Sequence, residues 1–165
     1  MFVAKSSDNK EGVYLVSKND RSDLVEQMKE VLSDNVKIYF KALGYHWNVK
    51  GVDFPEYHRL FGKIYEEVYD ATDSIAENIL FLGSDAPYML SEFQSRSSIQ
   101  DASVVNTPVS MMSDLLVSFE TYLMCLNKAL VLATMANEQG LINFLSGLID
   151  SNQKWVWQLR SSLQS

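Results

Sequence analysis

The stretch PYMLSEFQSRSSIQDASVVN, residues 87–106, separates two pairs of segments in which apolar residues recur at helical spacing. It is about 20 residues long, which is more than a hairpin between neighbouring helices requires. We therefore expect a crossover between the second and third long helices. A small helix is expected within this crossover, near Tyr88 to Phe93.

The four long helices are expected because their apolar residues recur every three to four positions. They cover about residues 22–50, 53–82, 107–137 and 141–162. Ser22 or Asp20 is the expected N-cap of the first helix and Asp53 that of the second, since short polar side chains accept hydrogen bonds from free backbone N–H groups. Thr107, followed by Pro108, marks the start of the third helix.

Four long helices and one extended connection predict an all-α fold, specifically a ferritin-like four-helix bundle whose long crossover carries a short helix. Any other four-helix bundle is the alternative. The chain has 165 residues, enough for one buried core. We expect an N-terminal tail over residues 1–20 and a single domain over residues 21–165.

The composition excludes several classes of protein. Lys and Arg total 14 against 21 Asp and Glu, which gives a net charge of −7, so the surface as a whole does not attract DNA. The single Cys125 cannot form an intrachain disulfide and is expected to be a buried, inert thiol. The first 20 residues lack an apolar signal core and no segment has 18 uninterrupted apolar residues, which predicts a soluble cytoplasmic protein without membrane contact. Phosphate-binding loops, hydrolase elbows and CxxC pairs are absent from the sequence.

Acidic side chains share one face of the second helix. At 100° per residue, Glu66, Asp70, Asp73 and Glu77 fall within a sector of roughly 60°. His58 lies on the same helix, and imidazole together with carboxylate suits iron, manganese or zinc. A solvated acidic face is the alternative explanation of the carboxylates.

The only two histidines flank the connector between the first two helices, in HWNVKGVDFPEYH, residues 46–58. The short connector brings His46 close to His58, so both imidazoles can serve one site. Hydrogen bonding to backbone as capping or core side chains is the alternative role for the pair. Neither has Glu three residues before it, which argues against a di-iron centre built from Glu-x-x-His motifs within one bundle.

His58 and Asp73 are too far apart to bind one ion within a single chain. They are 15 positions apart, which is roughly 22 Å along a straight helix, whereas metal–ligand bonds are about 2 Å long. A two-fold axis near Tyr65 and Glu66 would place two copies of the helix antiparallel. It would bring His58 of one subunit opposite Asp73 and Glu77 of the other.

Three motifs resemble the Dps proteins, the DNA-binding proteins from starved cells: YHWNVKG, DFPEYHRLF and DATDSIAENILFLG. The closing QKWVWQLRSSL is similar to the last helix of that family. The resemblance implies a hollow homododecamer, built from two-fold dimers, that oxidises ferrous iron with hydrogen peroxide, stores ferric mineral and protects against oxidative damage.

The resemblance also assigns roles to individual residues. It implies that His46 and His58 of one subunit and Asp73 and Glu77 of its partner are the ferroxidase ligands for iron, with zinc or manganese as ions that can take its place. Trp47 matches a family tryptophan beside the site, with an implied role in taking up oxidising equivalents.

Two departures from the family pattern change what is expected. Many members carry Asp where this chain has Gly62, so we expect a weaker second metal position. Compensation by Asp70 or Glu66 is the alternative. DNA-binding members commonly use a lysine-rich terminal tail, whereas residues 1–20 carry three lysines and three acidic residues. We therefore expect weak or no DNA binding, and association with the nucleoid only if DNA is bound.

Two other functions are compatible with the sequence. One is a structural or DNA-packing shell with an impaired metal site, which Gly62 favours. The other is a bundle that binds zinc or manganese for stability alone. If the protein is a ferroxidase, Glu138 and Asp150 are candidates for guiding iron inward.

Overall fold

The computed structural model describes residues 18–102 and 105–164, and this part of the chain contains five helices and no strand. The predicted N-terminal tail over residues 1–20, on which the expectation of weak or no DNA binding rests, lies mostly outside the described residues. The helices are α1 (Lys18–Asn48), α2 (Phe54–Phe81), α3 (Leu90–Arg96), α4 (Pro108–Met135) and α5 (Gln139–Ser162).

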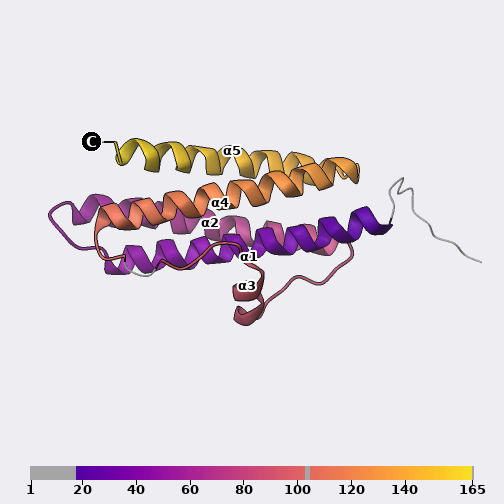
Figure 1. Cartoon of the computed structure of the whole chain (residues 1–165), viewed down its shortest axis with the longest axis horizontal. Coiled ribbons are helices and arrows are strands. Elements are labelled where there is room, and N and C mark those ends of the chain that lie inside the picture. The colour runs from indigo at the N-terminus through magenta and orange to yellow at the C-terminus, as the bar shows by residue number, and fades with distance from the viewer. Residues whose placement is uncertain (1–17, 103–104, 165) are drawn as a thin grey trace, which may run out of the picture.

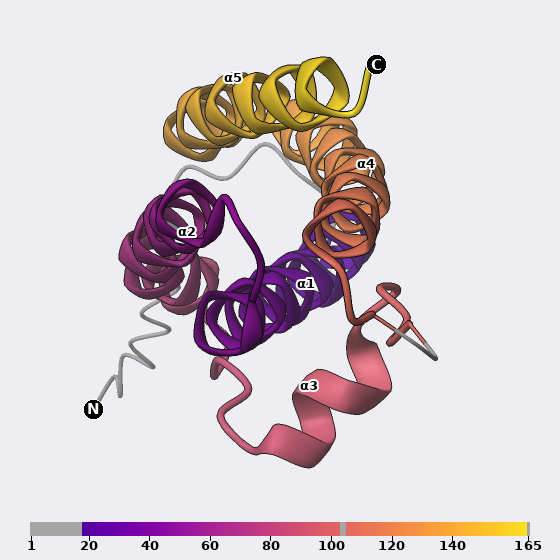
Figure 2. The ribbon, with the colours of Figure 1, turned by 90° about the vertical axis from the view of Figure 1, so that its left-hand side faces the viewer.

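The four long helices form a bundle with a crossover between its two halves. Helices α1 and α2 run antiparallel, as do α4 and α5, and the connection between α2 and α4 runs back along the bundle, so these two helices point the same way (Figure 1). Seen end-on, the long helices surround a common core and α3 lies outside it, beside α1 (Figure 2). The predicted all-α, ferritin-like bundle with a short helix in its crossover is confirmed.

Each long helix buries one apolar face in this core. The residues that are fully buried include Phe61, Ile64 and Ile75 of α2 and Phe119 and Tyr122 of α4. Burial of each large apolar side chain stabilises the fold by about 1.5–3 kcal/mol. The spacing of these residues at three and four positions is what makes the segments helical in this context.

Helix α4 is apolar enough to satisfy the length and composition expected of a membrane-spanning helix. Its mean hydropathy is 1.5 over an 18-residue window, and 39% of that window is buried inside the bundle. A core helix of a soluble protein meets the same criteria, so this composition is weak evidence for a membrane span.

The crossover is fastened to α1 by polar side chains. Asp34, which is fully buried, accepts hydrogen bonds from the Ser97 hydroxyl at 2.7 Å and from the backbone N–H and hydroxyl of Ser98 at 2.9 Å. Lys41 donates to the Gln100 carbonyl at 2.9 Å and pairs with Asp114 at 2.8 Å. The segment that distinguishes this bundle from an up-and-down one is therefore held by specific contacts.

The helix ends differ in places from those expected. Helix α1 begins at Lys18, so Asp20 and Ser22 lie inside the helix and the prediction of either as its N-cap was wrong. Asp53 occupies the N-cap position of α2 but makes no side-chain capping bond. Thr107 does cap α4, because its hydroxyl accepts from the Ser110 N–H at 3.1 Å.

Candidate metal centre

The two histidines meet where α1 ends and α2 begins. The connector between Asn48 and Phe54 folds the second helix back on the first, and the His46 and His58 rings stack with centroids 3.7 Å apart and planes 20° from parallel. Both side chains are partly buried. The predicted proximity of the two imidazoles is therefore present within a single chain.

Reciprocal hydrogen bonds fix the orientation of both rings. The Nδ1 of His46 lies 2.7 Å from the His58 carbonyl oxygen, and the Nδ1 of His58 lies 2.8 Å from the His46 carbonyl oxygen. Because a carbonyl oxygen only accepts, each Nδ1 must carry the proton. In the neutral rings each Nε2 then has a free lone pair, and a backbone bond of this kind is what typically orients a metal-binding histidine.

The stacked pair is enclosed by aromatic rings and by the backbone of α2. Phe54 stacks on His58 at 4.9 Å, and Tyr65 meets His46 edge-on at 5.1 Å. A Cβ at Gly62 would lie 3.3 Å from His46 Nδ1 and 3.4 Å from its Cε1. The absence of a side chain at Gly62 therefore leaves the space that the His46 ring occupies.

The two carboxylates lie far from the histidines along α2. This helix is continuous from Phe54 to Phe81, so His58 and Asp73 are separated by about 22 Å along its axis. Asp73 and Glu77 are exposed and one helical turn apart. In one protomer the four predicted ligands thus form two separate groups, a histidine pair and a carboxylate pair.

A different group of potential ligands does come together within the described residues of one chain. Atoms of Glu30, Asp34 and Cys125 lie within 4.8 Å of one another. Gln27 Nε2 donates to a Glu30 oxygen and to Cys125 Sγ, both at 3.2 Å, and Asp34 holds the crossover. The group is therefore a hydrogen-bonded network between helices. Burial, together with Asp34 and Glu30, raises the pKa of the Cys125 thiol, in keeping with the expected inert cysteine.

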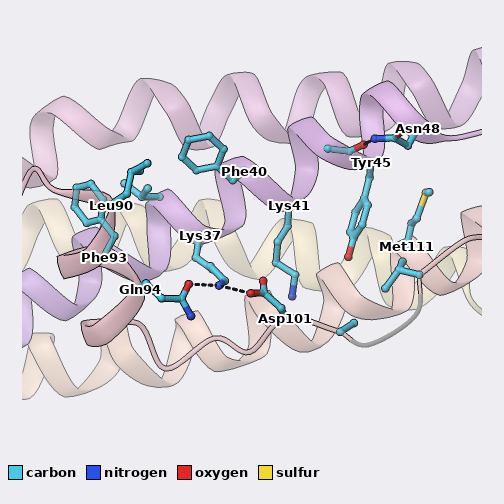
Figure 3. A pocket seen from close by; sticks show the side chains of 14 residues that line it. Lys37, Phe40, Lys41, Tyr45, Asn48, Leu90, Phe93, Gln94, Asp101 and Met111 are labelled. Carbon is cyan, nitrogen blue, oxygen red and sulfur yellow. Dashed lines mark hydrogen bonds and ion pairs between the residues drawn. The ribbon is translucent and has the colours of Figure 1, made fainter.

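A pocket of about 570 Å³ lies between α1, α3 and the segment near Asp101 (Figure 3). Within it Lys37 donates to Gln94 and to Asp101, both at 2.8 Å. None of the four predicted ligands is among the described residues that line it. This pocket is therefore distinct from the histidine pair.

The remaining predicted site residues lie at the surface. Trp47 is 67% exposed, and the ring contacts of the two histidines within the described residues are with each other, Phe54 and Tyr65. Glu138 pairs with Arg21 at 3.5 Å and Asp150 with Lys154 at 2.7 Å, so both candidates for guiding iron already have a basic partner. Glu66 and Asp70 are exposed on α2.

Comparison with known proteins places this architecture in a family. The ferritin-like domain family matches residues 25–165. A Bacillus anthracis protein named DNA protection during starvation protein 2 is 29% identical over 140 residues, which cover 85% of this chain and 96% of that protein. The chain belongs to the Dps family of ferritin-like proteins.

Solved structures of Dps proteins and their relatives share the fold. The antigen TpF1 from Treponema pallidum has a TM-score of 0.86 and 26% identity, covering 90% of this chain and 96% of that one. A Dps protein from Vibrio cholerae O1 has a TM-score of 0.85 and 26% identity, covering 90% and 94%. Its description places it among ferritin-like diiron-carboxylate proteins.

Sequence reasoning missed two residues that shape this member of the Dps family. Tyr65 contacts the His46 ring and Phe54 contacts the His58 ring. Tyr65 lies seven positions after His58, or about two helical turns, and this spacing was a usable signal. The sequence showed that Gly62 stands where many family members carry an Asp ligand. Its close approach to His46 depends on the packing of α1 against α2, which the sequence does not report.

Proposed function

We propose that this protein is a ferroxidase of the mini-ferritin type, which oxidises ferrous iron with hydrogen peroxide at sites between subunits. His46 and His58 of one subunit and Asp73 and Glu77 of its two-fold partner bind the iron. The complete particle is a hollow homododecamer that stores ferric mineral and limits oxidative damage in the cytoplasm. Iron is the substrate of this reaction, and zinc and manganese, which suit similar ligands, are competitors for the site.

One observation carries the proposal: the reciprocal Nδ1–carbonyl bonds of the stacked histidines. Those bonds hold both rings and leave each Nε2 free, at one end of a helix whose other end carries a carboxylate pair. An antiparallel partner related by an axis near Tyr65 and Glu66 would bring the two ends together. It would create two equivalent sites per dimer.

The proposed ligands determine what the site can do with iron. Two neutral imidazoles and two carboxylates carry a total charge of −2, which balances a ferrous ion. The residues therefore bind and position the iron so that the peroxide can react at an open coordination position.

The double variant His46→Ala with His58→Ala tests this function. We expect ferrous oxidation by stoichiometric peroxide to fall to the rate of iron without protein, because each site loses half its ligands. The change in ferric absorbance measures the rate, and size-exclusion chromatography checks the assembly. Asn48→Ala, an exposed position at the end of α1, is the matched control. Oxidation at the unaltered rate by an intact double-variant oligomer would refute the assignment.

A structural or DNA-packing shell with an impaired metal site is the second candidate, and Gly62 is the observation that favours it. The two candidates differ in measurable ways. A shell without ferroxidase activity would assemble but leave ferrous oxidation at the rate of free iron. A DNA-packing role would also give a mobility shift of duplex DNA at about 150 mM salt, where weak phosphate contacts are screened.

A further inference from the structure

A series of aromatic contacts leads from the histidine pair along α1 and α2. The Tyr65 ring lies 5.1 Å from His46 and 6.3 Å from Tyr39, and Tyr39 lies 5.5 Å from Tyr69. Three successive rings beyond His46 are thus tyrosines, and each is in contact with the next. Tyr65 is the only tyrosine of this series that touches a predicted iron ligand within the described residues.

These tyrosines differ from those that have a structural role. Tyr45 donates to Asp114 and Tyr122 donates to Asn35, and burial raises the pKa of both phenols. In the described part of the chain, the hydroxyls of Tyr39, Tyr65 and Tyr69 have no hydrogen bond to protein, and Tyr69 is 61% exposed. A phenol in this setting can release its proton to water when it loses an electron.

The stoichiometry of peroxide reduction requires an electron that one of these tyrosine rings can supply. Hydrogen peroxide needs two electrons to form water, whereas one ferrous ion supplies only one. Because Gly62 contributes no ligand atom, the histidine side of the site offers only two nitrogen ligands. A site that holds a single ferrous ion must therefore obtain its second electron elsewhere, or it releases a hydroxyl radical.

We propose that Tyr65 supplies this second electron and that Tyr39 and Tyr69 carry the resulting oxidising equivalent away from the iron. The ferrous ion loses one electron and becomes ferric. The Tyr65 phenol loses one electron and one proton and becomes a neutral phenoxyl radical. The Tyr65 proton passes to water, and the peroxide accepts both electrons and two protons from water, its O–O bond breaks, and two water molecules form. This inference rests on the proposed ferroxidase function.

Trp47 is the competing donor. Its side chain is 67% exposed, and among the described residues its ring does not stack on or meet the edge of either histidine ring, whereas the Tyr65 ring meets the His46 ring edge-on. Within a single chain Tyr65 is therefore the oxidisable ring with the direct contact. The experiment must distinguish these two residue types.

The test uses the full-length oligomer, loaded without oxygen with one ferrous ion per site and mixed with one equivalent of hydrogen peroxide. Freeze-quenched electron paramagnetic resonance is expected to show a phenoxyl signal that narrows when the protein contains ring-deuterated tyrosine. In Tyr65→Phe the ring remains but the phenol is lost, so the signal should fall to background. A spin trap should then capture several-fold more hydroxyl radical.

Tyr57→Phe is the matched control, because Tyr57 lies next to His58 on α2 but stacks on Phe61 at 6.5 Å and is not part of the series. It should leave the signal and the trapped radical unchanged. An undiminished phenoxyl signal in Tyr65→Phe, no radical in the unaltered protein, or narrowing only with deuterated tryptophan would overturn the proposal. Ferric absorbance is recorded in parallel, so these outcomes can occur while ferrous oxidation is intact. Loss of oxidation in the unaltered protein would instead refute the ferroxidase function.

Discussion

At the scale of single residues, Gly62 determines how the histidine pair sits. Its missing side chain lets the His46 ring approach the backbone of α2, where an added Cβ would be only 3.3 Å from Nδ1. That same nitrogen makes the hydrogen bond to the His58 carbonyl. A methyl group at this position would therefore press on the contact that orients the ring.

Gly62→Ala is expected to weaken ferrous binding about tenfold, because disturbing the hydrogen bond that orients a ligand commonly reduces metal affinity by this order. Anaerobic titration with ferrous iron measures the affinity. Gly147→Ala is the matched control: it is also inside a long helix, and nothing lies within 4 Å of its added Cβ. The control should bind iron normally and be more stable by about 0.5–1 kcal/mol, since alanine favours a helix. Unchanged affinity in Gly62→Ala would show that His46 adjusts freely.

The sequence indicated which residues could be ligands but not how the two rings are held. The spacing of His46 and His58 around a short connector predicted that they lie close together, and the structure confirms it. Their stacking and reciprocal backbone bonds depend on the packing of α1 on α2 at atomic scale. No periodicity in a sequence reports on such contacts.

At the scale of secondary-structure elements, the crossover depends on one buried carboxylate. Asp34 accepts three hydrogen bonds from Ser97 and Ser98, and these link the end of α3 to the middle of α1. By contrast, the ion pair between Lys37 and Asp101 is formed by an aspartate whose side chain is 68% exposed. The two contacts join the same elements but differ in burial.

Asp34→Ala is expected to lower the free energy of unfolding by about 2–4 kcal/mol, because it removes three hydrogen bonds to a fully buried carboxylate. Asp101→Ala removes a contact to the same crossover and should cost less than about 1 kcal/mol, as for other exposed ion pairs. Urea unfolding followed by circular dichroism compares the two. Equal costs would show that the buried bonds do not hold the crossover.

The long helices could be predicted from their apolar period, but their ends could not all be predicted. Thr107 was predicted as the start of the third helix because Pro108 follows it, and its hydroxyl does cap α4. Asp20 and Ser22 looked equally suitable, yet α1 continues past both to Lys18. The short helix is shifted as well: it was expected near Tyr88 to Phe93, whereas α3 begins at Leu90 and extends to Arg96.

At the scale of the whole molecule, the continuity of α2 requires a second chain for the proposed site. The histidine pair and the carboxylate pair lie on one unbroken helix about 22 Å apart. The sequence predicted this separation from helical rise alone. The number of subunits in the particle depends on the surfaces between chains, and helical rise does not predict it.

Mixing two inactive variants tests the shared site directly. One chain carries His46→Ala and His58→Ala, and the other carries Asp73→Ala and Glu77→Ala. After they are unfolded and refolded together, each heterodimer should contain one complete site and one without any of the four ligands. Peroxide-dependent ferrous oxidation should then return to about a quarter of the unaltered activity for random pairing. No recovery in properly assembled mixed oligomers would contradict ligands shared between chains.

In the proposed antiparallel contact between two copies of α2, the residues nearest the two-fold axis lie opposite the same residues of the partner subunit. Glu66 sits beside the proposed axis, and each copy would then confront an identical carboxylate. A substitution of Glu66 changes both facing side chains at once. The electrostatic repulsion between them scales with the square of the charge at this position. A single substitution at position 66 can therefore change the stability of this contact between subunits.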